Sequence, residues 1–266
     1  MSISSTVVDR ADIRFHKAAD PLQPFVGCFW VVTADRAATI RVVPDGSAAI
    51  SIQLQNDAAS EWFLRGPLIR PDERRFTSPA TLVGIRLRPG VAFLLSGMPT
   101  HRLVGRRTGV TAIAAFHDLV ADDLGAATPE RCIEVLERFL LQRLERATLH
   151  TTVAAALGEI ERAHGCVRVP ELAARCGVSA RHLHRLMRIW LGYGPKQYAT
   201  VIRFQATLNQ MADRPARTGA ALASDNGFFD QAHLALDLSR FADATPTRLA
   251  SVDVSDFSKT RCDGLS

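Results

Sequence analysis

The residues best suited to chemistry in this sequence are the arginines and histidines of the segment SARHLHRLMR. If the segment is helical, one face presents a cationic set, namely Arg181, His184, Arg185 and Arg188. Guanidinium groups neutralise phosphates, and they also donate paired hydrogen bonds to the O6 and N7 atoms of guanine. This spacing therefore favours binding to nucleic acid, and the alternative is a helical hairpin with a solvated basic face.

The other reactive side chains lack the spacing that catalysis or metal binding requires. The carboxylates of Asp45, Glu61, Asp72 and Glu73 lie in turn-like, charged surroundings, which is typical of solvated loops. The histidines show no metal-ligand spacing, Ser96 lies outside any G-x-S-x-G turn, and no glycine-rich phosphate loop is present. We expect no catalytic residue, no metal and no cofactor, and an enzyme in the N-terminal part is the weakest alternative.

Two short helices joined at a glycine must position the basic face. The first is expected over Pro170–Cys176, and Gly177 ends it because glycine adopts the left-handed conformation at little cost. Ser179 then caps a second helix. The inward residues of that helix are Leu183, Leu186, Met187 and Trp190. Ala173 must be small because the second helix crosses it closely. This is the plan of a helix-turn-helix, whose second helix enters the major groove of DNA.

The same plan returns between Ala221 and Pro246. At one constant offset, Leu172, Ala173 and Gly177 correspond to Leu222, Ala223 and Gly227. After the glycines the offset grows by one residue, so Leu183 matches Leu234 and Pro195 matches Pro246. Residues 194–213 read as one long connecting helix. Two units on such a helix can present recognition helices to successive major grooves, about 34 Å apart.

Charge is distributed unevenly between the two units. From Arg162 to Arg203 the sequence carries eight lysines and arginines against one acid, Glu171, a balance of +7. From Thr218 to Ala250 it carries two arginines against four aspartates, a balance of −2. Phosphate neutralisation supplies much of the affinity for DNA, so we expect the first unit to provide most of the binding. The alternative is that the second unit only supports the first.

The N-terminal part reads as β-rich. Strands are expected over residues 25–33, 38–43, 47–55 and 81–87, separated by the turn signals PDG, RGP and RPG. A helix is expected after Pro89, and another over Thr128–Ala147, capped by Thr128. The inward face of the latter is predicted as Ile133, Leu136, Leu140, Leu141 and Leu144. Some aromatic residues could line an effector pocket or form the core, namely Phe25, Phe29, Trp30, Trp62 and Phe63.

These elements predict an α+β protein with two domains. We expect a barrel-like, β-rich sensing or dimerisation domain with a helical connector over residues 1–148. An all-α domain of two helix-turn-helix units joined by a long helix is expected over residues 151–252.

Composition agrees with a globular protein and sets further limits. The chain has 266 residues, of which 47% are hydrophobic, with a net charge of +5. No secretion signal opens the sequence, and its apolar runs are shorter than the ~20 residues of a membrane helix. The five cysteines are odd in number and widely spaced, so free thiols in a reducing cytoplasm are expected.

The C-terminal region resembles the AraC/XylS family of transcriptional regulators. The resemblance rests on LAARCGVSARHLHRLMRIWLGYGPKQY, on RFQATL, and on GFFDQAHLALDLSRFADATPTRL. The patterns S-x-R-x-L-x-R from Ser179 and D-Q-x-H from Asp230 are specific in this order. In the N-terminal part, WVV, PDG, GIRLRPG and FLLSGMP are similar to a β-rich domain on one branch of these regulators.

The resemblance implies a ligand-responsive regulator that binds double-stranded DNA in the cytoplasm. Arg181, His184 and Arg188 would enter the groove from the first unit, with Arg185 and Lys196 on phosphates. Gln231 and His233 would act from the second unit. A small-molecule effector and a homodimer are the further partners expected. The rival hypothesis is a drifted helix-turn-helix protein that acts through a partner protein.

This sequence departs from the family in its second unit. Family members of this branch usually carry Arg where Leu236 stands, an aromatic residue at Leu238, a basic residue at Ser239, Gly at Asp243 and Tyr at Leu249. Leu236 is the most consequential change, because the family's arginine at this position can reach DNA. Its helical spacing predicts that Leu236 is exposed, or used against a partner.

Overall fold

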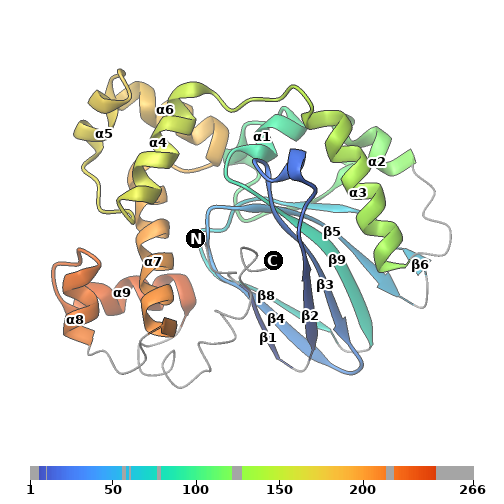
Figure 1. Ribbon diagram of the computed structural model, residues 1–266. Coiled ribbons are helices and arrows are strands. Elements are labelled where there is room, and N and C mark those ends of the chain that lie inside the picture. Colours follow the sequence, from blue (N-terminus) through green and yellow to red (C-terminus); the bar gives the residue numbers. More distant parts are fainter. Residues whose placement is uncertain are drawn as a thin grey trace.

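The computed structural model describes residues 6–9, 11–55, 58–59, 61–76, 79–121, 128–213 and 219–243. The described residues form a β-rich part followed by a helical part, which lie side by side in Figure 1. The chain passes from the first part to the second between Leu144 and Thr151.

The β-rich part contains two antiparallel sheets. The larger sheet has the strand order β10 (Arg107–Gly109), β7 (Phe63–Arg65), β5 (Ala48–Gln55), β9 (Ala80–Leu87), β3 (Val26–Ala34), β2 (Asp12–His16), with β6 (Ala58–Ala59) paired to β5. The smaller sheet has the order β1 (Thr6–Asp9), β4 (Ala38–Val42), β8 (Asp72–Phe76). The four strands expected from sequence correspond to β3, β4, β5 and β9. The strands that were not predicted are shorter or carry several charged residues.

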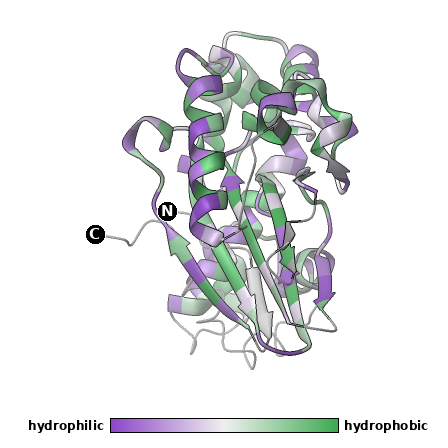
Figure 2. Cartoon of the chain, turned by 90° about the vertical axis from the view of Figure 1, so that its right-hand side faces the viewer, coloured by the Kyte–Doolittle hydropathy of each residue, from purple (hydrophilic) through white to green (hydrophobic). Residues whose placement is uncertain are grey.

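The central strand β3 is buried on both faces, which explains its almost continuous apolar sequence. Phe29 and Val31 join the core that the helices cover. Trp30 and Val32 point the other way, because alternate side chains of a strand face opposite sides, and they pack with residues of the smaller sheet. In Figure 2 several strands carry long hydrophobic stretches, whereas hydrophobic and hydrophilic residues alternate along the helices. The two sheets therefore enclose an interior of their own.

Short helices and one long helix cover the larger sheet. They are η1 (Asp20–Leu22), α1 (Val91–Ser96), η2 (Thr100–Arg102), η3 (Val110–Ala112), η4 (Ala114–Phe116), α2 (His117–Ala121) and α3 (Pro129–Leu144). Thr128 caps α3 as predicted, since its hydroxyl accepts the N–H of Arg131 at 3.2 Å. The predicted inward face of α3 was partly wrong. Leu141 is exposed and Ile133 only partly buried, because α3 turns Val135 and Phe139 to the core instead.

Six helices make up the helical part. They are α4 (Thr151–Arg162), α5 (Val169–Arg175), α6 (Ala180–Leu191), α7 (Pro195–Asp213), α8 (Gly219–Asp225) and α9 (Gln231–Ala242). Helices α4, α5 and α6 share one apolar core, and α8 and α9 share another with the later turns of α7. Figure 1 shows α7 running between these two groups. The predicted α+β architecture, a β-rich part followed by paired helix-turn-helix units on a long helix, is confirmed.

One cysteine differs from the expectation of free thiols. Cys28 is disulfide-bonded. Cys132, Cys166 and Cys176 are free. Over the described ranges, no three His, Cys, Asp or Glu side chains are grouped so as to hold a metal ion. Within those ranges, too, no helix has the length and apolar character needed to cross a membrane.

Candidate nucleic-acid interface

The turn of the first helix-turn-helix unit is built as its sequence predicts. Gly177 has a φ of +68°, and its N–H donates to the carbonyl of Ala174 at 3.0 Å. The N–H of Val178 donates to the carbonyl of Ala173 at 3.0 Å, which closes the end of α5. Ser179 then caps α6, its hydroxyl accepting the N–H of His182 at 3.2 Å. The turn fixes the angle at which α6 leaves α5.

The second unit repeats this turn bond for bond. Gly227 has a φ of +67°, and the N–H of Phe228 donates to the carbonyl of Ala223 at 2.9 Å. The carboxylate of Asp230 caps α9 by accepting the N–H of His233 at 2.8 Å. Ala173 and Ala223 are both buried, as the close crossing of the helices requires. The repeat found in the sequence is therefore a repeat of structure.

The exposed face of α6 is cationic and borders an open groove. The groove has a volume of about 710 Å³ and is lined by His101, Ser179, Arg181, His182, His184, Arg185, Arg188 and Ile189. All four residues predicted for this face line it, and each is exposed. Lys196 is also exposed, on the first turn of α7. His101 was missed as a groove residue, because it comes from η2 in the β-rich part and no local pattern connects it to α6.

Ion pairs revise the charge count of the first unit. Arg162 and Arg175 both pair with Glu159, at 2.5 and 2.9 Å. Arg168 pairs with Glu171 at 3.2 Å, and Arg203 pairs with Asp237 of α9 at 3.3 Å. Within the described residues, the cations of this unit without a carboxylate partner are Arg181, Arg185, Arg188 and Lys196. The net charge of +7 therefore overstated the positive charge that is available to a ligand. The cations that remain unpaired are residues predicted to bind DNA.

The second unit is less acidic at its surface than its sequence suggested. Asp237 is buried against Arg203, and Asp243 pairs with Arg41 of β4 at 3.3 Å. The carboxylate of Asp230 is occupied in the helix cap. Three of the four aspartates in the balance of −2 are therefore engaged in contacts within the protein.

The two residues predicted to bind DNA from the second unit differ in their surroundings. Gln231 is exposed at the start of α9. His233 is partly buried, with its ring edge-on to Phe228 at 5.4 Å and its Nδ1 accepting the N–H of Phe229 at 3.5 Å. Gln231 is thus accessible, and His233 contacts the turn residues Phe228 and Phe229.

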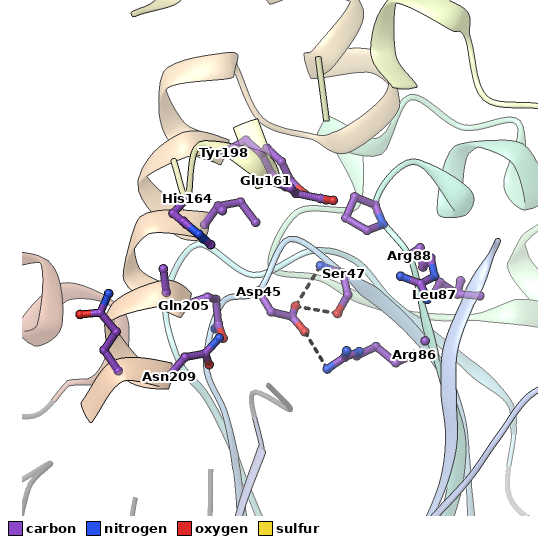
Figure 3. A pocket seen from close by; sticks show the side chains of 15 residues that line it. Asp45, Ser47, Arg86, Leu87, Arg88, Glu161, His164, Tyr198, Gln205 and Asn209 are labelled. Atoms are coloured by element: carbon purple, nitrogen blue, oxygen red, sulfur yellow. Dashed lines mark hydrogen bonds and ion pairs between the residues drawn. The ribbon is translucent and has the colours of Figure 1, made fainter. Parts of the chain in front are cut away.

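A polar cleft of about 310 Å³ lies between the β-rich and helical parts. Figure 3 shows Asp45, Ser47 and Arg86 on one side, and His164, Tyr198, Gln205 and Asn209 on the other. The amide nitrogen of Gln205 donates to the carbonyl of Pro44 at 2.6 Å, and the hydroxyl of Tyr198 donates to Glu161 at 2.9 Å. Burial raises the pKa of Tyr198 well above its usual range, so it stays a donor. None of the predicted DNA-binding residues lines this cleft.

A second cavity, of about 90 Å³, lies between the two sheets. Its walls combine apolar residues, including Trp30, with Arg65, Arg74, Arg86 and Arg107. Burial, and then the charge of Arg107, lower the pKa of Arg74 to about 10, and burial also lowers the pKa of Arg65. The other aromatic residues named as pocket candidates do not line this cavity. Phe29 and Trp62 are core residues, Phe25 packs against that core, and Phe63 stacks on Arg107.

Known proteins resemble the chain in two regions and in its fold. Residues 14–108 match a domain of unknown function (DUF6597), and residues 172–251 match a helix-turn-helix domain. No protein of curated function matches the chain. ToxT from Vibrio cholerae aligns over 92% of this chain and 98% of its own, with 8% identity and a TM-score of 0.43. The AraC-like transcriptional activator CuxR aligns over 67% of this chain and 80% of its own, with 11% identity and a TM-score of 0.20.

The match at residues 172–251 covers both turns and both of the helices that follow them. The predicted resemblance to the AraC/XylS regulators is confirmed. The chain carries an AraC-type helix-turn-helix domain at its C-terminal end, behind a DUF6597 domain.

Proposed function

We propose that this protein is a sequence-specific DNA-binding transcriptional regulator that responds to a ligand. The observation that carries the proposal is the exposed face of α6, where the unpaired cations of the first unit collect on the recognition helix of a helix-turn-helix. Binding of this kind needs no covalent step, so the protein acts without catalysis. The cytoplasm is where such a regulator meets its promoter.

Roles on the interface follow from position along the helices. Arg181, His184 and Arg188 read base edges in the major groove, and Arg185 and Lys196 hold phosphates on either side. Gln231 and His233 act on DNA from the second unit, and His233 also contacts the turn before α9. The domain boundary lies between residues 148 and 151, and a homodimer would place two such domains on one promoter.

The cavity between the sheets is the effector site that we propose. Among the described residues, the side chain of Arg65 forms neither an ion pair nor a hydrogen bond, although it lines this cavity together with three other arginines and Asp72. Buried charge is stable only when it is paired. An effector with one negative charge and a small apolar group supplies that pairing, with Trp30 and Leu82 against its apolar end.

Binding to a selected operator tests the function. The full chain selects its tightest duplex from random DNA, and affinity is then measured by fluorescence anisotropy at several salt concentrations. We expect Arg181→Ala or Arg188→Ala to cost ~1–3 kcal/mol and to relax the preference at one base pair. Gln231→Ala costs less. Lys196→Ala lowers the salt slope by about one unit, because one phosphate contact is lost.

Arg175→Ala is the matched control. It removes the same charge from the same unit, but Arg175 is paired with Glu159 and lies outside the groove. Its affinity for the operator should stay within about twofold of the wild type, as expected for a surface change away from the interface. A chain that selects no duplex over random DNA contradicts the proposal and supports the rival, a protein that works through a partner.

A further inference from the structure

The exposed face of α9 is chemically unlike that of α6, although the two helices occupy equivalent positions in their units. When α6 and α9 are aligned by the sequence offset that matches Leu183 to Leu234, the outward residues of α6 correspond to small or apolar residues of α9. Arg181 corresponds to Ala232, His184 to Ala235, Arg185 to Leu236, and Arg188 to Ser239. The three arginines of this face therefore have no charged counterpart in α9.

These residues face away from the core. Leu234, Leu238 and Phe241 are buried and define the inward side of α9. Leu236 lies about 200° from Leu234 around the helix, and 69% of it is exposed. Phe229, in the turn just before α9, is 93% exposed. Both are large apolar side chains that the core does not use, which leaves them available for contact with a ligand.

Two aspartates, one in α9 and one at its C-terminal end, form ion pairs with arginines of the protein, and Asp230 caps the helix. The carboxylates of Asp230, Asp237 and Asp243 are occupied by the helix cap, by Arg203 and by Arg41. Arg240, at the edge of the face, lies over the ring of Phe241 at 5.0 Å. The surface that remains around Leu236 can exclude water against an apolar group but cannot neutralise a phosphate.

Only one base presents an apolar group in the major groove, and that base is thymine, through its C5 methyl. We propose that α9 reads thymine methyl groups, with Leu236 as the main contact and Ala232 beside it. Gln231 is exposed at the start of the same helix. Its side-chain amide can form two hydrogen bonds with the N6 and N7 atoms of adenine. The operator is then asymmetric, with guanine-containing steps under α6 and A·T steps under α9. This inference rests on the proposed DNA-binding function.

Replacing thymine by deoxyuridine tests the inference, because it removes the methyl group and leaves base pairing intact. In the selected duplex, each thymine of the segment under α9 is replaced in turn, and the dissociation constant is measured with the full chain. We expect a loss of about fourfold at each methyl that Leu236 covers. One buried methyl is worth about 0.8 kcal/mol, and 1.4 kcal/mol corresponds to a factor of ten.

The variant Leu236→Ala should bind the thymine duplex more weakly and lose the deoxyuridine penalty. Leu141→Ala is the control, since Leu141 is an exposed leucine on α3, far along the chain from the interface. It should keep the full penalty. Thermal melting monitors folding of both variants.

Two results separate the inference from the function. If the chain binds its selected duplex tightly and no thymine under α9 is sensitive to deoxyuridine, then DNA binding stands and methyl reading is wrong. The same conclusion follows if Leu236→Ala retains the penalty, and the apolar face is then a docking surface for a protein. If no duplex is selected at all, the proposed function itself fails.

Discussion

Arg65 is the cation in the β-rich part whose surroundings least suit a charge. It lines the cavity between the sheets, where burial lowers its pKa more than the charges of Asp45, Asp72 and Tyr193 raise it. Removing a poorly paired buried charge is often neutral or stabilising. Its retention is explained if an anionic effector completes the site.

The variant Arg65→Met tests this role. A cavity of about 150 Å³ can bind benzene, and this cavity is smaller. We therefore choose butyrate as the anionic probe and butyramide as the uncharged control. We expect butyrate to raise the melting temperature of the wild type, butyramide to have no effect, and Arg65→Met to abolish the butyrate shift while melting at or above the wild-type temperature. Arg70→Met, at an exposed arginine outside the cavity, should keep the shift. Equal shifts from both probes would argue against an anion site.

The paired turns show how local sequence sets the geometry of whole helices. Gly177 and Gly227 adopt almost the same positive φ, and each is followed by a capping side chain. At the end of α9 the family's glycine is replaced by Asp243, which also takes a left-handed conformation, with a φ of +48°. Aspartate tolerates this conformation better than most residues. The helix therefore still ends there, at some cost in stability.

Changes at the first turn should separate backbone strain from side-chain packing. Gly177→Val forces a β-branched residue into the left-handed region, and we expect a loss of at least ~1–2 kcal/mol in the free energy of unfolding. Ala173→Leu overpacks the crossing of α5 and α6 and should cost ~1–3 kcal/mol. Gly158→Ala, within α4 and clear of close contacts, should stabilise by up to about 1 kcal/mol. Chemical denaturation of the full chain measures all three, and an unchanged Gly177→Val would show that the turn is not under this constraint.

Contacts between the β-rich and helical parts include a docked turn and the end of α6. The turn between β4 and β5 docks on α7, where Gln205 bonds to Pro44 and Val43 enters the core of the second unit. At the end of α6, Thr100 donates to the carbonyl of Trp190 at 2.8 Å, and Phe93 packs on the Trp190 ring. Gln205 also lines the polar cleft of Figure 3, so the docked turn borders this cleft.

Gly46→Val should break the docking of the turn. Gly46 has a φ of +82°, and a Cβ there would lie 2.6 Å from the Tyr198 ring. We expect calorimetry to resolve two unfolding transitions in this variant where the wild type shows one. Gly105→Val is the control, because Gly105 has a similar φ of +65° but open space around it. It should lower stability without splitting the transition, and identical behaviour of the two variants would mean that strain alone is responsible.

The sequence by itself determined the features that depend on neighbours along the chain. Glycine turns, helix caps, the helical period and the repeat of the two units are all short-range, so Gly177, Ser179 and the cationic face of α6 were predicted correctly. It also predicted that Leu236 is exposed, from spacing alone.

Only the tertiary structure decided which charges are available and which cavities exist. Arg203 and Asp237 were counted as opposing charges of separate units, yet they neutralise each other across α7 and α9. His101 reaches the groove of α6, and Arg65 and Arg74 meet across two sheets, although nothing in their local sequence connects them. The physical reason is that Coulomb interactions and burial depend on distance in space, and a local pattern carries no information about contacts between residues far apart in the chain.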